Sequence, residues 1–128
     1  MRSPDGNIED VRKKNFSKNE KIWCGWIEIP GHQFPLRGRQ FTDPMVFSPN
    51  SRFLALTEFT ITDQQMSRVV VLDFITDRQT IALDEKSERI EDMASVTSLR
   101  WTDDLTLRIG TLAGDFSDGE RIRIWRAA

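Results

Sequence analysis

The chain contains one thiol and one imidazole, Cys24 and His32, which lie eight positions apart. A thiolate beside a base is a nucleophile, so this pair is the first candidate for covalent chemistry. Cys24, however, belongs to the apolar segment IWCGWI, residues 22–27. A thiol in such a segment is usually a small buried hydrophobe. We therefore expect Cys24 in the core and His32 in a loop, with no catalytic dyad.

Paired carboxylates are the second candidate, because one acid and one base together can hydrolyse a bond. Asp103 and Asp104 are adjacent, as are Glu91 and Asp92. Adjacent acids in turn sequences are usually solvated turn formers. The sequence has no nucleophile elbow, phosphate-binding loop, zinc-ligand cluster or H-E-x-x-H pattern, and one histidine cannot form a histidine-based metal site. We expect no enzyme, no catalytic residues, no metal and no cofactor.

Acidic side chains gather in two segments, which predict a surface for a basic protein partner. Residues 84–92, DEKSERIED, hold five acids and two bases, and a second acidic segment follows at residues 115–120. Charge clusters of one sign steer association more than they stabilise a fold. The alternative is that residues 84–92 form only a polar connection between two strands. The acids assigned to the partner surface are Asp84, Glu85, Glu88, Glu91, Asp92, Asp115 and Asp118.

Trp23 and Trp26 are the apolar residues assigned to the same partner surface. They flank Gly25 and fall on opposite faces of one strand, so one of them is exposed wherever one face is open. An exposed Trp is a typical interface anchor. The alternative is that both pack in the core. Arg37 and Arg39 flank a glycine and could contact a phosphate, although two exposed arginines are usually only solvated.

Composition places these residues in one soluble domain. The 128 residues are 38% apolar, 30% charged and 9% aromatic. A formal net charge of −2 lacks the basic excess of a nucleic-acid binder, so no direct contact with nucleic acid is expected. One cysteine cannot form an intramolecular disulfide. No apolar stretch approaches the length of about 20 residues that a bilayer requires, so we expect a cytoplasmic protein without membrane contact.

The pattern from residue 22 onward predicts an all-β domain over residues 22–128, with at most one short helix. Before it, residues 1–21 are expected to form a polar arm with a helical turn near residues 7–14. Short runs rich in Val, Ile, Phe, Trp and Thr alternate with turn clusters. The expected strands lie at about residues 22–29, 45–48, 52–61, 68–75, 79–84, 96–102, 105–112 and 120–126. The run VVVLDFI, residues 69–75, is apolar on both faces and should be covered on both. In residues 105–109, Leu and Ile alternate with Thr and Arg, which predicts one wet face.

The two halves of the domain repeat, which predicts two antiparallel meanders at about residues 45–84 and 96–126. Phe47-Ser48-Pro49-Asn50 followed by FLAL corresponds to Trp101-Thr102-Asp103-Asp104 followed by LTLRI, and RVVVLD corresponds to RIRIWR. VFSPNSRFLAL and RVVVLDFITDRQ resemble a β-propeller blade, and ERIRIWR resembles the third strand of a WD-repeat blade. The G-H dipeptide of WD repeats is absent, and Ser51 stands where such turns have Gly.

Length decides how such blades could assemble. A closed propeller needs at least four blades of about 40 to 45 residues. The chain is shorter, so we expect an open half-propeller or a two-sheet sandwich of antiparallel meanders. The last meander ends after three strands, and segment 22–29 is expected to complete it.

A small acidic all-β domain without catalytic groups is typical of a binding protein. It is similar in type to the immunity proteins of interbacterial toxin systems, including contact-dependent growth inhibition. That similarity implies an antitoxin that blocks a basic toxin, such as a nuclease, by stoichiometric binding. The alternatives are a propeller-like scaffold or adaptor and, third, a hydrolase that uses carboxylates.

Overall fold

The computed structural model describes residues 1–8, 10–19, 22–61, 65–82, 96–112 and 120–127. These residues form antiparallel strands and no helix. A six-stranded sheet has the order β1-β2-β3-β4-β5-β6, and a three-stranded sheet has the order β7-β8-β9. The predicted all-β class with open antiparallel sheets is confirmed. The strands are β1 (Arg12–Asn19), β2 (Ile22–Glu28), β3 (Phe41–Phe47), β4 (Phe53–Ile61), β5 (Gln65–Asp73), β6 (Arg78–Ile81), β7 (Val96–Trp101), β8 (Thr106–Leu112) and β9 (Glu120–Arg126).

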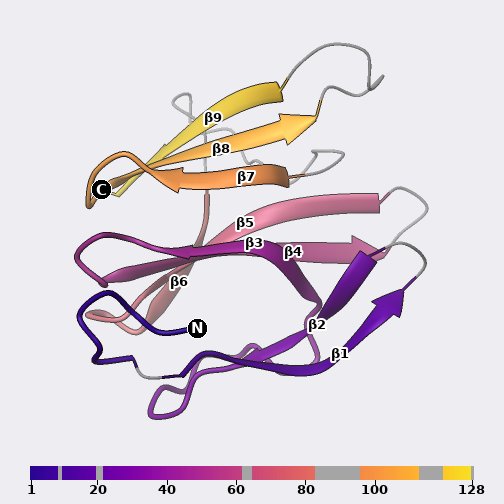
Figure 1. Cartoon of the computed structure of the whole chain (residues 1–128), viewed down its shortest axis with the longest axis horizontal. Coiled ribbons are helices and arrows are strands. Elements are labelled where there is room, and N and C mark those ends of the chain that lie inside the picture. The colour runs from indigo at the N-terminus through magenta and orange to yellow at the C-terminus, as the bar shows by residue number, and fades with distance from the viewer. Residues whose placement is uncertain (9, 20–21, 62–64, 83–95, 113–119, 128) are drawn as a thin grey trace.

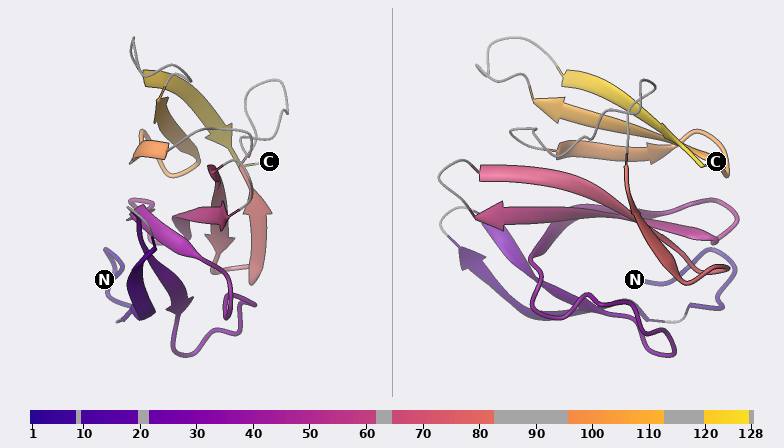
Figure 2. Two further views of the ribbon diagram at one scale, coloured as in Figure 1. Left: turned by 90° about the vertical axis from the view of Figure 1, so that its right-hand side faces the viewer. Right: turned by 180° about the vertical axis from the view of Figure 1, so that it is seen from behind.

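The nine strands lie in three layers (Figure 1). β1 and β2 form the first layer, which bends beneath the middle layer of β3–β6. This bend is possible because a single residue pair, Gly25 with Phe41, joins β2 to β3. The third layer, β7–β9, lies on the other side of the middle layer, as the views in Figure 2 also show. The middle layer is therefore covered on both faces.

β4 and β5 separate two apolar cores, because their side chains alternate between the two covered faces. Val70 and Leu72 point into the first core, whereas Val69 and Val71 point into the second. All four are at most 2% exposed, which confirms the prediction for residues 69–72. The first core also contains Ile8, Val11, Ile27, Ile29, Leu36, Phe41, Phe47, Leu54 and Leu56. The second core also contains Phe53, Ala55, Ala82, Val96, Leu99, Leu107, Ile109 and Trp125.

The third layer has one buried face and one wet face, as its sequence predicts. Leu107 and Ile109 are fully buried, whereas Arg108 between them is half-buried. Leu105, expected on the buried face, is 48% exposed, because it lies in the turn before β8 begins at Thr106. The strand expected to reach residue 75 is shorter, and Ile75 is 72% exposed. β5 ends at Asp73 because the Asp73 carboxylate accepts a hydrogen bond from the backbone N–H of Ile75 at 2.9 Å, which forms a turn.

The two expected meanders are present as consecutive antiparallel strands, β3-β4-β5-β6 and β7-β8-β9. The first turn of each meander is closed by a backbone hydrogen bond. The backbone N–H of Ser48 donates to the carbonyl of Phe53 at 2.8 Å, and that of Thr102 donates to the carbonyl of Thr106 at 3.0 Å. Ser51 has a φ of 64°, the left-handed conformation that glycine adopts most readily.

Two expectations about the N-terminal third are wrong. The described residues within 7–14 form no helical turn, because Ile8 and Val11 pack into the first core and β1 begins at Arg12. Segment 22–29 does not complete the last meander. As β2 it pairs with β1 and β3 instead, and its Ile27 faces the first core rather than the second.

The described part of the chain contains no helix with the length and hydrophobicity that a bilayer crossing requires.

Candidate functional site

The structure does not bring the thiol and the imidazole together. Cys24 is 2% exposed on β2, in the buried position expected for it. His32 lies in the loop after β2, where its Nδ1 is 3.4 Å from an Asp77 carboxylate oxygen. Its ring packs edge-on against Phe74, with the ring centroids 5.0 Å apart. Among the described residues, no hydrogen bond joins Cys24 to His32, and no group of three His, Cys, Asp or Glu side chains could hold a metal ion.

Of the two carboxylate pairs, the structure describes Asp103 and Asp104, and the Asp103 carboxylate takes part in a turn. Asp103 lies between β7 and β8 and accepts a hydrogen bond from the backbone N–H of Leu105 at 2.8 Å. This bond is the main reason why the pKa of Asp103 is lowered. The carboxylate thus serves to close the turn. Glu91 and Asp92 lie outside the described residues.

The predicted acidic surface also lies outside the described residues, so the basic partner stays a prediction. This holds for Asp84, Glu85, Glu88, Glu91, Asp92, Asp115 and Asp118.

The two tryptophans of β2 have different environments. Trp23 is 55% exposed, which makes it an exposed large hydrophobic residue of the described chain. Trp26 is half-buried, and the guanidinium carbon of Arg37 lies 5.6 Å from its ring centroid. Trp23 is therefore the tryptophan available to a partner.

Trp23 is held in place by groups on both of its neighbouring strands. The hydroxyl of Thr42 on β3 donates a hydrogen bond to the backbone carbonyl of Trp23 at 2.9 Å. On the other side, the ring of Phe16 on β1 lies 6.4 Å from the Trp23 ring, tilted by 55°. The exposed indole therefore projects from paired strands and not from a loose loop.

Gly25 makes this arrangement possible. A Cβ built on Gly25 would lie 2.3 Å from Cδ1 of Phe16 and 2.5 Å from the carbonyl oxygen of Lys14. The close approach follows from a β-bulge in β1 between Lys14 and Ser17, where Asn15 has a φ of 51°. A glycine is needed opposite the bulge because the Phe16 ring occupies the space of a side chain.

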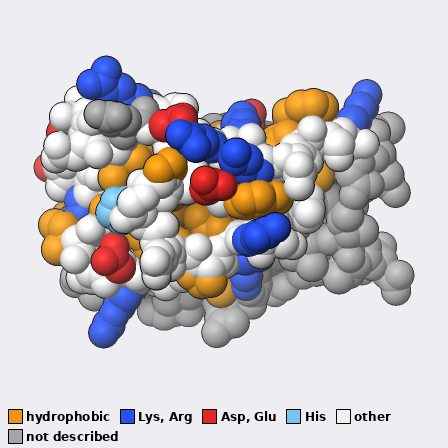
Figure 3. Space-filling view, turned by 90° about the horizontal axis from the view of Figure 1, so that it is seen from below, with side chains coloured by type: hydrophobic (Ala, Val, Ile, Leu, Met, Phe, Trp, Pro, Cys, Tyr) orange, Lys and Arg blue, Asp and Glu red, His pale blue; other side chains and the backbone are white. Residues whose placement is uncertain are grey.

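Two lysines of β1 lie near the residues that hold the exposed indole. Lys18 is the direct cross-strand partner of Trp23. The Nζ of Lys13 lies 5.4 Å from the Phe16 ring centroid and 3.1 Å from an Asp43 carboxylate oxygen. The face seen from below in Figure 3 carries basic and acidic side chains beside hydrophobic ones. We call Phe16, Trp23, Lys13 and Lys18 the Trp23 surface.

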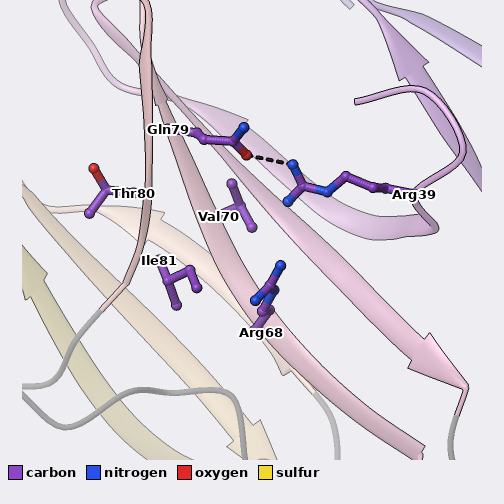
Figure 4. A pocket seen from close by; sticks show the side chains of 6 residues that line it. All are labelled: Arg39, Arg68, Val70, Gln79, Thr80 and Ile81. Carbon is purple, nitrogen blue, oxygen red and sulfur yellow. Dashed lines mark hydrogen bonds between the residues drawn. The ribbon is translucent and has the colours of Figure 1, made fainter. Parts of the chain in front are cut away.

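A separate hollow of about 330 Å³ opens beside β5 and β6 (Figure 4). Arg39, Arg68 and Gln79 border it, with Val70 and Ile81 as its apolar lining, and Thr80 projects from the other side of β6. Arg39 donates to the amide oxygen of Gln79 at 2.5 Å.

Both arginines of this hollow are bonded to the buried carboxylate of Glu58. Nε of Arg39 donates to one oxygen at 2.6 Å, and Nε of Arg68 donates to the other at 2.5 Å. Burial would raise the pKa of Glu58, but the hydrogen bonds and charges of the two arginines outweigh burial and lower it. The network therefore ties the loop after β2 to β4 and β5, and the guanidinium of Arg39 is engaged with Glu58 and Gln79.

No protein-family model, no curated protein and no solved structure matches this chain.

Proposed function

We propose that this chain is a non-catalytic binding protein that docks a protein partner through the Trp23 surface. The 55% exposure of Trp23 carries this proposal. The indole of Trp23 lies against the Phe16 ring, and Thr42 bonds the backbone carbonyl of Trp23, so this large aromatic side chain loses little conformational freedom on binding. Tryptophan is also among the residues that most often dominate the energy of an interface.

The specific form we propose is an immunity protein that blocks a toxin by one-to-one binding. Two features support it: the presented indole of Trp23, and the acid-rich segments 84–92 and 115–120 of the sequence, which suit a basic toxin. On this proposal the indole fills a pocket on the toxin, and the acidic segments increase the association rate. No turnover is involved.

A propeller-like scaffold is the second candidate, and the arrangement of the meanders favours it. The strands follow one another within β3–β6 and within β7–β9, as in propeller blades. β3 also packs beside β7, so the two meanders are neighbours, as consecutive blades would be. A scaffold of this kind would bind a partner without protecting against it.

Co-expression with the product of the adjacent reading frame tests these proposals. The complex should co-purify at one-to-one stoichiometry and restore growth. Trp23→Ala should weaken binding by about 2 kcal/mol or more, chiefly through faster dissociation. Ile75→Ala is the matched control, because Ile75 is 72% exposed on the turn after β5 and is not part of the Trp23 surface.

The dose at which growth is restored separates the functions. An immunity protein restores growth at equal amounts, a scaffold binds without restoring growth, and an enzyme acts at far smaller amounts. If Trp23→Ala protects as well as Ile75→Ala, the Trp23 surface is not the docking site.

A further inference from the structure

The outward face of the third layer carries a pair of arginines that folding does not explain. One face of β7–β9 packs on the second core. No described element covers the opposite, outward face (Figure 1). The alternation of the strands places Ser98, Arg100, Thr106, Arg108, Ile124 and Arg126 on it. We call these residues the arginine face.

Arg100 and Arg108 are direct cross-strand partners in the register of β7 and β8. Like charges directly opposite each other on a sheet repel and destabilise it. Neither guanidinium makes a hydrogen bond or an ion pair with any residue that the structure describes.

Several other arginines of the described chain are paired with carboxylates. Arg12 pairs with Asp10 at 2.7 Å, Arg39 with Glu58 at 2.6 Å, and Arg52 with Asp73 at 3.0 Å. Arg37 and Arg78 form no ion pair with a described carboxylate either, but neither of them lies directly opposite another arginine. The juxtaposed charges of Arg100 and Arg108 lack such a partner within the described chain.

We propose that the arginine face binds an acidic surface of another protein, with carboxylates of that surface placed between Arg100 and Arg108. The planar guanidinium presents parallel N–H groups that match the two oxygens of a carboxylate. The hydroxyls of Ser98 and Thr106 add polar groups on the same face, and the half-buried Ile124, opposite Arg108, adds an apolar contact.

An acidic protein fits this face better than a nucleic acid does. Phosphate and carboxylate offer the same acceptor chemistry, but a nucleic acid is a long polyanion that interacts with the whole molecule. The formal net charge of this chain is −2, and its residues 40–128 hold fifteen acids against ten bases. A local cluster of carboxylates, by contrast, interacts mainly with charges within the Debye length of about 8 Å. Two adjacent arginines provide positive charge at that range.

This inference goes beyond the proposed function and is independent of it. The arginine face belongs to the third layer, whereas the Trp23 surface belongs to the first, on the other side of the middle layer (Figures 1 and 2). Loss of binding at one surface therefore leaves the other intact.

Titration of the ¹⁵N-labelled full chain with poly-L-glutamate tests the arginine face. The backbone amides of Arg100, Arg108 and Ile124 should shift, and the affinity should fall as salt is added. The double variant Arg100→Ser, Arg108→Thr should bind at least tenfold more weakly. Its amide spectrum and its unfolding midpoint verify that it is folded.

The control is Arg37→Ser, Arg78→Ser, which removes the same charge from two exposed arginines elsewhere. It should bind poly-L-glutamate within about twofold of the unmodified chain, because it keeps Arg100 and Arg108. A 20-residue oligo-dT is the second probe and should bind more weakly than poly-L-glutamate. The proposal is overturned if poly-L-glutamate does not bind, or if the amide shifts it causes are centred on β1. It is also overturned if the two double variants lose the same affinity, or if oligo-dT binds more tightly than poly-L-glutamate.

Discussion

Trp101 donates its indole N–H to the backbone carbonyl of Val46 at 3.0 Å. This bond joins β7 to β3 and therefore the three-stranded sheet to the six-stranded one. Trp101 also stacks on Phe53, with ring centroids 5.7 Å apart and an interplanar angle of 13°. Its ring meets the ring of Trp125 edge to face, with the ring centroids 5.7 Å apart. One aromatic cluster thus forms much of the junction between the sheets.

Trp101→Phe should destabilise the protein by about 1–2 kcal/mol, because the Val46 carbonyl loses its donor and part of the stacked area is lost. Urea denaturation measures the change. Trp23→Phe is the control, since that indole is exposed, and it should shift the unfolding free energy by less than about 0.5 kcal/mol. Equal midpoints for the two variants would show that the indole bond does not stabilise the junction.

Leu72→Ala should cost about 2–4 kcal/mol, because it leaves a cavity in the first core. Arg108→Ala, on the wet face of β8, should lower the unfolding free energy by less than about 0.5 kcal/mol. The substitution also removes the repulsion between Arg108 and Arg100, which partly offsets the loss. Chemical denaturation of both variants compares the two faces. A cost for Arg108→Ala similar to that for Leu72→Ala would contradict the burial described for β5 and β8.

Most strands after residue 21 could be predicted from their side-chain patterns. β3 is an exception, because it begins at Phe41 and not near residue 45, and a register shift between Thr42 and Met45 interrupts its pattern. Val69 to Leu72 are apolar on both faces, and only a strand covered on both sides accommodates that pattern. β1 could not be predicted in the same way. It has one apolar residue, Phe16, and its lysines and serine resemble a solvated arm, since an edge strand does not need an apolar face.

Glu58→Gln should destabilise the protein by about 2–3 kcal/mol at neutral pH, because Arg39 and Arg68 lose their charged partner. The pKa of Glu58 in the folded state lies below its usual value of 4.5. Its stabilising contribution is therefore complete above about pH 4.5 and is lost as the pH falls through the folded-state pKa. The difference in unfolding free energy between the unmodified chain and the variant should shrink below about pH 4.5. Denaturation at several pH values measures it, and a difference independent of pH would contradict this account.

Gly25→Ala should destabilise the protein by about 1–3 kcal/mol, because the added methyl group would overlap the Phe16 ring and the Lys14 carbonyl. The NMR shift of the Trp23 indole N–H should change with it. Gly31→Asn is the control: Gly31 has a φ of +85° with no atom within 4 Å of a built Cβ, and Asn tolerates this conformation. Unperturbed stability of Gly25→Ala would show that the bulge can move.

The candidate surfaces could be predicted only in part. The sequence places Trp23 and Trp26 on opposite faces of one strand, but which of them is exposed depends on the loop that brings Arg37 over Trp26. The alternation of β8 places Arg108 on a wet face. That Arg100 lies directly opposite depends on the register of β7, which no single strand encodes.

The two apolar cores share only the strands that separate them, and this division has a consequence for local unfolding. Each outer layer contributes side chains to one core, so β7–β9 can open while Val70 and Leu72 stay packed in the first core. Amide hydrogen exchange should therefore be slowest in β4 and β5 and should speed up layer by layer on either side. A ligand on one outer layer would slow exchange in that layer alone, so exchange rates would identify which end of the stack is occupied.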